Sequence, residues 1–376
     1  MEHISKPRIL IVCDGGLDHG GIQAVIMASV RNLSSMYVFD ALVSTNKERY
    51  YDREFLSYGG KIFRVPRYEG PSILMHHFDV LLYGLTSYPR IKRIIKINGP
   101  YQAIHCHNNY ESSNVLSISK KEGIPVRVLQ AHVVTKYGKG HISRKLFNYF
   151  LRKGFRNANV RIGCSAEACE SLFGQQRYTV VPNPYDETRY DIRKYKRSTQ
   201  EVLSIIQVGS YNKNKNQLFT VKVFSIIKKR FKNALLRFVG FELESGYLEQ
   251  VKNEIEKLGI KANVQFFPDD TDIPKLLSES SYFVLPSVSE GFGIVLIEAQ
   301  AMGMKCFSSD SVPSLTNCGG CRYLPVDDCS AEKWANAICN SFISDRGIHT
   351  SYDCGRFSTS NYINSMKTIY RGDYAD

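Results

Sequence analysis

The chain has 376 residues, a formal net charge of +13, and contents of 43% hydrophobic and 23% charged residues. This length favours two domains over a single core, and the composition is typical of a soluble globular protein. No apolar run reaches the roughly 18 residues of a transmembrane helix, and the N-terminus lacks the apolar core of a secretory signal, so we expect a cytoplasmic protein.

Ten cysteines are spread from Cys13 to Cys354. In a long chain without a secretory signal we expect them to be reduced thiols. Cys318 and Cys321 form the one CxxC pair. Zinc would need a second pair at metal-like spacing, and Cys329 and Cys339 do not provide it. We therefore favour neither a structural metal nor a redox role.

The first half of the chain alternates strand-like and helix-like segments. Strands are predicted at residues 8–13, 40–43, 61–65, 103–107 and 126–129, and helices at 22–33 and 113–121. Such alternation implies a doubly wound α/β domain with a parallel sheet. The glycine-rich loop at 15–21 is not GxGxxG, so the dinucleotide-binding fingerprint is absent.

A basic segment follows, because residues 123–166 contain no acidic side chain. Apolar residues interleave with the cations at helical spacing, which predicts an amphipathic helix suited to an anionic membrane surface. The predicted membrane contacts are Arg144, Lys145, Arg152, Lys153 and Arg156. A solvated basic face is the alternative. We do not expect nucleic acid as a partner, since no zinc-finger, RNP-type or helix-turn-helix pattern is present.

The alternating pattern restarts after a break at Pro182-Asn183-Pro184, where two prolines oppose regular structure. Strands are predicted at residues 203–208, 235–239, 264–267, 282–285 and 305–308, and helices at 217–229, 248–258 and 360–370. We therefore expect a first domain at 1–184, a second at 185–358, and a C-terminal helical segment at 359–376.

The most informative segment is 281–303, which reads as strand, loop and helix. Pro286 stops the strand, and the loop contains Glu290-Gly291-Phe292-Gly293 before a helix at 294–302. A glycine-flanked helix N-terminus after a parallel strand is a ready anion site. Glu290 lies at the edge of that site and Glu298 about one turn into the helix. The site would hold an anion, and the two carboxylates could bind hydroxyl groups beside it. A nucleotide sugar has both kinds of group.

This segment resembles the Glu-x7-Glu signature of retaining glycosyltransferases of the GT-B fold, in particular family 4. The resemblance implies two Rossmann-like domains whose parallel sheets face a central cleft, and a final helix that crosses back to the first domain. It implies that Glu290 contacts the donor sugar and that Glu298 hydrogen-bonds the ribose. The amides of Gly291, Phe292, Gly293, Ile294 and Val295 would hold the sugar hydroxyls and diphosphate.

Other donor-site positions follow from the same resemblance. After Gly209 the family has an arginine and, five residues later, a lysine, which clamp the diphosphate; here these are Ser210 and Lys215. Lys213, Tyr211 or the N-terminal glycine loop would have to replace the missing cation. In that loop Gly20 and Gly21 resemble the family's diphosphate-facing Gly-Gly pair. Ile273 is expected near the base, after an N-cap in Asp269-Asp270-Thr271-Asp272.

Histidines follow two predicted strands of the first domain. His132 comes after the strand at 126–129, at the sheet edge that faces the ligand in open α/β folds. By the resemblance it would lie near the donor sugar and the reacting carbon, where a neutral imidazole could accept the acceptor's proton or orient a hydroxyl. His107 and Asn108 are predicted on the acceptor side.

We therefore predict a retaining glycosyltransferase that moves a hexose or N-acetylhexosamine from a nucleotide sugar, preferably UDP-linked, to a lipid-linked oligosaccharide. The pathway would be capsule, exopolysaccharide or O-antigen assembly on the inner face of the membrane. No cofactor or metal is expected, since the nearest Asp-x-Asp, at 270–272, is assigned to the N-cap. The alternatives are a GDP-sugar transferase, a nucleotide-sugar epimerase or hydrolase, and a non-catalytic GT-B partner subunit.

Overall fold

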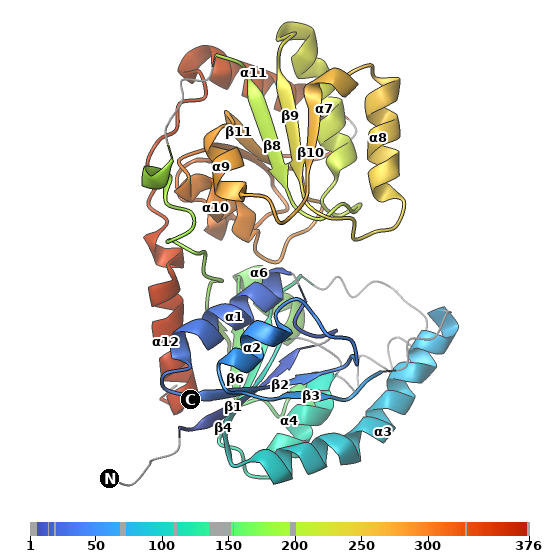
Figure 1. The fold of residues 1–376 in the computed structure, drawn as a ribbon, viewed down its shortest axis with the longest axis vertical. Coiled ribbons are helices and arrows are strands. Elements are labelled where there is room, and N and C mark those ends of the chain that lie inside the picture. The colour runs from blue at the N-terminus through green and yellow to red at the C-terminus, as the bar shows by residue number, and fades with distance from the viewer. Residues whose placement is uncertain are drawn as a thin grey trace. The chain divides into compact units, whose positions relative to one another are not determined.

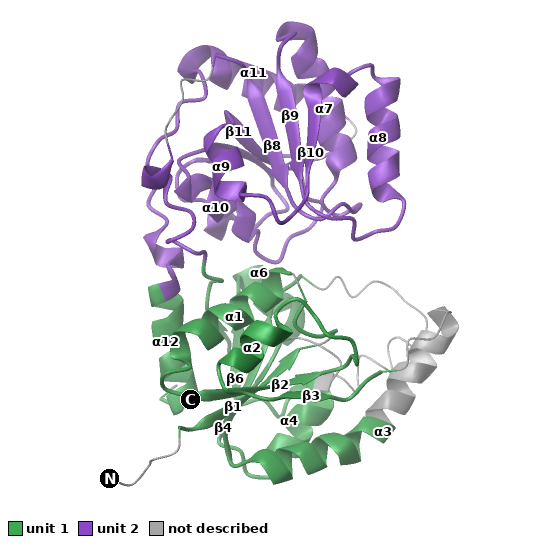
Figure 2. Ribbon diagram, in the orientation of Figure 1, with its two compact units in different colours: residues 1–184, 360–376 green, residues 185–359 purple. Residues whose placement is uncertain are grey.

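A computed structural model of the protein describes residues 6–13, 15–18, 20–67, 73–107, 111–134, 152, 154–195, 201–327 and 329–373, with the backbone alone for 73–85 and 111. The chain divides into two compact units (Figures 1 and 2). The first contains residues 1–184 and 360–376, and the second contains residues 185–359. The predicted sites Asn108, Arg144, Lys145 and Lys153 lie outside the described residues.

The first unit contains a parallel sheet in the order β3-β2-β1-β4-β5-β6-β7. Its strands are β1 (Arg8–Cys13), β2 (Val38–Val43), β3 (Ile62–Arg64), β4 (Tyr101–Cys106), β5 (Val126–Ala131), β6 (Val160–Gly163) and β7 (Thr179–Val180). Its helices are α1 (Gly21–Leu33), α2 (Asp52–Ser57), α3 (Ile73–Asn98), α4 (Glu111–Lys121), α6 (Ala166–Phe173) and α12 (Thr359–Arg371).

One core of this unit lies between the sheet and helices α1, α2 and α12. Strand residues two apart point to the same face, so Ile9, Ile11 and Cys13 all join this core. The last helix contributes buried Met366 and Tyr370 to it. α12 therefore completes the first unit, although residues 185–358 of the second unit precede it in the chain.

A buried carboxylate distinguishes β2. Asp40 is fully buried and accepts hydrogen bonds from Arg8 (Nη2, 2.5 Å), the Tyr101 hydroxyl (2.9 Å) and the Lys61 amide (2.9 Å). A buried charge needs such partners. β2 begins at Val38, two residues before the predicted strand.

The second unit repeats the arrangement with six parallel strands in the order β10-β9-β8-β11-β12-β13. These are β8 (Ser204–Val208), β9 (Leu235–Val239), β10 (Val264–Phe267), β11 (Tyr282–Leu285), β12 (Lys305–Ser309) and β13 (Cys321–Leu324). Its helices are α7 (Gln217–Arg230), α8 (Tyr247–Lys257), α9 (Ile273–Ser278), α10 (Ile294–Ala301) and α11 (Ala331–Asp345).

Helices cover both faces of this sheet (Figure 1). Tyr282 and Val284 of β11 pack with α7, α8 and α11, whereas Phe283 and Leu285 pack with α9 and α10. A strand that is apolar on both faces is expected only inside a two-sided α/β layer. The predicted pair of doubly wound parallel sheets is thus confirmed.

Several elements were not predicted, namely α2, α3, α6, α11, β6, β7 and β13. β7 has only two residues, which is too short to show a periodicity. Pro89 lies inside the 26-residue α3, where a proline is normally a stop signal. β13 contains the exposed Arg322, so its pattern is weakly apolar.

Candidate active site

The loop after β11 is shaped by glycine at its junction with α10. Gly293 is the N-cap of α10 with φ 88°, a left-handed conformation that favours glycine, and an added Cβ would lie 3.1 Å from Val312 Cγ1. The first amides of α10, including those of Ile294 and Val295, have no carbonyl group of the helix to bond to, because no turn of the helix precedes them. The positive end of the helix dipole therefore faces the loop that carries Glu290.

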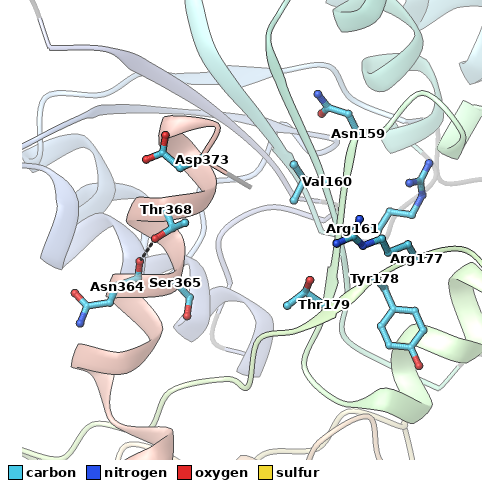
Figure 3. A pocket seen from close by; sticks show the side chains of 10 residues that line it. All are labelled: Asn159, Val160, Arg161, Arg177, Tyr178, Thr179, Asn364, Ser365, Thr368 and Asp373. Carbon is cyan, nitrogen blue, oxygen red and sulfur yellow. Dashed lines mark hydrogen bonds between the residues drawn. The ribbon is translucent and has the colours of Figure 1, made fainter. Parts of the chain in front are cut away.

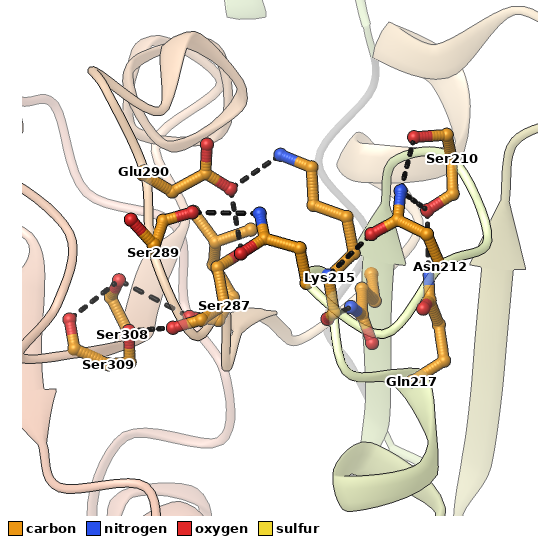
Figure 4. A network of polar contacts seen from close by, with 12 residues as sticks. Ser210, Asn212, Lys215, Gln217, Ser287, Ser289, Glu290, Ser308 and Ser309 are labelled. Atoms are coloured by element: carbon orange, nitrogen blue, oxygen red, sulfur yellow. Dashed lines mark hydrogen bonds and ion pairs between the residues drawn. The ribbon is translucent and has the colours of Figure 1, made fainter. Parts of the chain in front are cut away.

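Lys215 and Glu290, 75 residues apart in the chain, form an ion pair at this place (Figure 4). The Lys215 Nζ lies 2.5 Å from the Glu290 Oε1, and the side chains are 20% and 11% exposed. The Ser287 hydroxyl donates to the same carboxylate oxygen at 2.7 Å. The prediction that these two residues share one site matches the geometry, although their roles in binding stay predictions.

The loop after β8 is tied to the loop after β11 by asparagine side chains. Asn214 Nδ2 donates to the Ser289 carbonyl oxygen at 2.8 Å, and Asn216 Nδ2 donates to the Pro286 carbonyl oxygen at 3.3 Å. Asn216 itself has φ 56°, which asparagine tolerates better than most residues. These contacts fix Lys215 between the two loops.

Glu298 lies one turn into α10 and interacts with the segment that enters the second unit. Burial raises the pKa of Glu298 to about 7, against the opposing effects of a hydrogen bond from Tyr190 and the charge of Arg189. Tyr190 is itself buried. Sequence reasoning missed Arg189 and Tyr190, because they lie outside the strand–loop–helix pattern and reach Glu298 only through folding.

In the first unit, His107 and His132 directly follow β4 and β5, which are neighbours in the sheet. His107 Nδ1 lies 2.8 Å from His132 Nε2, and both side chains are buried. Burial lowers the pKa of His132 to about 3 and that of His107 well below 6.5, so both rings are neutral. Among the described residues, His107 Nε2 and His132 Nδ1 are buried without a hydrogen-bond partner.

Because the two neutral rings share one proton, their outer nitrogens have opposite roles. The ring that donates the shared hydrogen keeps an acceptor at its outer nitrogen, and the other ring carries its hydrogen there. One outer nitrogen is thus a donor and the other an acceptor, and either can bond to a hydroxyl group. His105 differs, since its two nitrogens already contact Tyr370 and Gln130 at 2.9 Å.

Comparisons with known proteins identify the family of this chain. Residues 19–189 match the family model described as Glycosyltransferase Family 4, and residues 189–350 match that described as Glycosyl transferases group 1. The chain belongs to the family-4 glycosyltransferases of the GT-B fold. It is therefore an enzyme, a hexosyltransferase.

Among relatives of this glycosyltransferase, EpsF of Bacillus subtilis (strain 168), named as a glycosyltransferase, is 29% identical over 84% of this chain and 82% of its own. The capsular polysaccharide biosynthesis glycosyltransferase CapH of Staphylococcus aureus is 21% identical over 75% of this chain and 76% of its own. A solved structure, HepE of Anabaena in complex with UDP, has a TM-score of 0.73 at 15% identity and covers 96% of this chain and 98% of that one.

The glycosyltransferase departs from its family at Ser210, and the structure corrects one expectation there. The Ser210 hydroxyl accepts from Asn212 Nδ2 at 3.0 Å (Figure 4). Lys213 pairs instead with Glu244 at 3.0 Å, and Tyr211 is buried in the apolar core. Burial therefore removes Tyr211 as a replacement for the missing arginine. Lys213, whose side chain is 74% exposed, and the N-terminal glycine loop stay predicted replacements.

The remaining predicted donor-site residues are placed as follows. Gly209 precedes Ser210 with φ 152°, so a side chain there would be strained. Ile273 opens α9, whose N-cap is Asp272, as predicted. Gly20 is the N-cap of α1 and Gly21 its first residue. The left-handed positions of that loop are instead Gly15 and Gly16.

A pocket of the first unit lies away from these residues (Figure 3). Its volume is about 680 Å³, and Arg161, Arg177 and Asp373 line it. Val160 and Arg161 open β6, so the pocket lies at the amino ends of the strands. Ligands of open α/β sheets bind at the carboxyl ends, and we assign this pocket no part in transfer.

Three further predictions concern metal and membrane. No group of three or more metal-ligating side chains is found in the described residues, and metal independence stays a prediction. None of the helices in the described part of the chain has the length and apolar character of a membrane span. Arg152 and Arg156, the two predicted membrane contacts within the described residues, are exposed, and their membrane contact also stays a prediction.

Proposed function

We propose that this glycosyltransferase transfers a hexose or N-acetylhexosamine from a UDP-sugar to a lipid-linked oligosaccharide, with retention of configuration, during surface polysaccharide assembly. The ion pair between Lys215 and Glu290 at the start of α10 carries the proposal. Support for the nucleotide comes from HepE, solved with UDP and with UDP-glucose. Support for the pathway comes from the name of CapH.

The ion pair suggests how donor binding and leaving-group stabilisation are connected. Without a donor, Lys215 and Glu290 neutralise each other. A diphosphate at the α10 N-terminus would draw the Lys215 ammonium away and leave the Glu290 carboxylate free to accept hydrogen bonds from sugar hydroxyls. Lys215 and the helix dipole would then stabilise the negative charge that develops on the departing diphosphate.

Glu298 and Ile273 would bind the nucleoside part of the donor. With a pKa near 7, the Glu298 carboxyl exists in both protonation states at neutral pH. It could therefore donate to or accept from a ribose hydroxyl. Ile273 offers an apolar side chain at the start of α9, suited to the face of a base.

The histidine pair would serve the acceptor sugar. His132 and His107 offer one donor and one acceptor, either of which could bond to a sugar hydroxyl. Because both rings stay neutral, they would orient the hydroxyl for attack by hydrogen bonding. Retention through front-face attack requires no second carboxylate of the hydrolase type. We propose that a metal ion is also unnecessary, so activity should survive chelation with EDTA.

Docking to the inner leaflet would give access to a lipid-linked acceptor. Each basic side chain near an anionic leaflet contributes about 1 kcal/mol. Charge reversal at Arg144, Lys145, Arg152 and Lys153 should release the protein from vesicles that contain phosphatidylserine. Unchanged pelleting with these vesicles would remove the membrane proposal while leaving the transfer proposal intact.

The first test is a thermal-shift screen with UDP, GDP, ADP and their common sugars, run on the wild type and on Lys215→Ala. We expect UDP to stabilise the wild type, one UDP-sugar to stabilise it further, and the variant to lose most of the shift. Stabilisation by GDP alone would favour the GDP-sugar alternative.

The family matches argue against a non-catalytic partner subunit, although Ser210 removes one cation from the diphosphate clamp. A subunit of that kind would show no stabilisation by any nucleotide in the same screen. A purified protein that transfers sugar from a UDP-sugar without another subunit would exclude it.

A further inference from the structure

Two cysteines of the second unit, 36 residues apart in the chain, are in direct contact. The Cys354 thiol donates a hydrogen bond to the Cys318 sulfur, and the Sγ–Sγ distance is 2.7 Å. A disulfide bond is about 2.05 Å long, so the two sulfurs need to approach by only roughly 0.7 Å to form one. In the structure described here both are free thiols.

Cys318 lies in a turn that is held from several sides. Its amide donates to Gln300 Oε1 at 2.7 Å, and the Gly320 amide donates to the same oxygen at 3.2 Å. The Arg356 guanidinium donates to the carbonyl oxygens of Leu315 (2.6 Å) and Asn317 (2.8 Å). A fixed cation therefore stands next to the residue that precedes Cys318.

The two thiols differ in exposure and in acidity. Cys318 is partly exposed, whereas Cys354 is 3% exposed. The hydrogen bond from Cys354 lowers the pKa of Cys318, and Arg356 acts in the same direction. The same hydrogen bond raises the pKa of Cys354. An accessible, acidic thiol beside a buried second thiol is the arrangement found in reversible redox sites.

The neighbouring cysteines lack these features. Burial raises the pKa of Cys321 to about 12 and that of Cys306 well above its ordinary value. Such thiols are inert at neutral pH. The CxxC spacing of Cys318 and Cys321 therefore points to the wrong partner, because folding brings the sulfur of Cys354 to Cys318.

We propose that Cys318 and Cys354 form a peroxide-sensitive thiol–disulfide site, independent of the transferase reaction. The Cys318 thiolate attacks one oxygen of hydrogen peroxide, the O–O bond breaks, and hydroxide leaves and takes up a proton. The Cys354 sulfur then attacks the resulting sulfenic acid, so that the S–S bond forms, the S–O bond breaks and water leaves. Two thiols and one peroxide give one disulfide and two waters, and the sulfurs lose two electrons to the peroxide.

This disulfide would tie down the segment by which the chain leaves the second unit. Cys354 precedes Phe357, whose carbonyl oxygen accepts from the Tyr185 amide at 3.1 Å, and the unit ends at Thr359. Residue 185 is also where the chain enters this unit. The oxidised second unit should therefore resist thermal unfolding better than the reduced one, since the cross-link constrains its unfolded state.

The experiment uses the purified full chain, reduced, desalted and exposed to a small excess of hydrogen peroxide. Peptide mapping without reductant should identify a Cys318–Cys354 cross-link that dithiothreitol reverses. Cys318→Ser and Cys354→Ser should abolish it, and Cys329→Ser, which removes an exposed cysteine, should retain it. Arg356→Gln should slow its formation.

The peptide map of the oxidised wild type tests the proposal even if a variant folds poorly. A Cys318–Cys321 cross-link in the wild type would overturn the choice of partner. Recovery of both cysteines as unmodified thiols, or oxidation of Cys318 to sulfinic acid without a cross-link, would overturn the site.

Discussion

The two units share the strand order 3-2-1-4-5-6, yet their ligand-facing edges carry opposite chemistry. The second unit places a charged pair, Lys215 and Glu290, beside a helix N-terminus. The first unit places neutral histidines, His107 and His132, after β4 and β5. One scaffold thus carries a charged cluster in one unit and an uncharged one in the other, and the loops after the strands determine which. In the proposed function these would serve the anionic leaving group and the acceptor hydroxyl.

The largest effect is expected from a substitution in the charged site. Glu290→Ala should reduce transfer by about 10³-fold, because it removes a carboxylate at the reacting sugar and leaves Lys215 without its partner. The measurement is initial-rate transfer with UDP-sugar, together with circular dichroism to verify folding. Glu244→Ala, which removes the carboxylate of the exposed Lys213 pair, is the matched control and should retain activity. Near wild-type transfer by Glu290→Ala would contradict the assignment of this site.

A smaller loss is expected when the neutral site is broken. His132→Asn should reduce transfer by about 10²-fold, because it removes the ring that would orient the acceptor hydroxyl. His107→Asn combined with it should cost little more, since the rings act as a unit. His349→Asn serves as the control, because it removes a buried imidazole of the second unit that bonds to the Ser280 carbonyl oxygen. Additive losses in the double variant would contradict the shared-proton pair.

A substitution at Ser210 can restore the arginine of the family and increase the positive charge of the second unit's site. Ser210→Arg should tighten UDP binding by about tenfold, equivalent to about 1.4 kcal/mol, because a second cation would face the diphosphate. Isothermal titration of UDP measures this gain. Ser225→Arg adds the same charge on α7, where Ser225 bonds only within its helix, and should leave the affinity unchanged. Weaker or unaltered binding by Ser210→Arg would indicate that the diphosphate lies elsewhere.

The smallest expected effect is an opposite response of the two units to pH. The pKa of His105 and His132 falls from 6.5 to about 3 on folding, so their contribution to stability is complete above pH 6.5 and is lost as pH falls toward 3. The pKa of Glu298 rises from 4.5 to about 7, so its contribution is complete below pH 4.5 and is lost as pH rises through 7.

Lowering the pH from 7 to 5 should therefore destabilise the first unit and stabilise the second, with the larger change in the first, where two imidazoles contribute. Hydrogen exchange followed by mass spectrometry resolves the units separately. Glu298→Gln should flatten the response of the second unit and leave that of the first unchanged. Parallel responses of both units in the wild type would refute the assignment.

Much of the fold was predictable, because parallel strands buried on both faces leave an unmistakable local pattern. β11 and α10 could be read to within one residue, since Pro286 and Gly293 mark their limits. Short or proline-containing elements escaped, as β7 and α3 illustrate. At the site, the sequence predicted Lys215, Glu290 and His132, but offered no signal for Arg189 or Tyr190.

The sequence by itself determined the two α/β halves, the Glu-x7-Glu signature and the place of Lys215, because these depend on spacing along a short stretch of chain. Only the tertiary structure decided which side chains meet. It paired His107 with His132, engaged Lys213 and Tyr211 away from Ser210, and joined Cys318 to Cys354 instead of Cys321. The physical reason is that these contacts depend on strand order and loop conformation, which bring distant residues together and which no local periodicity encodes.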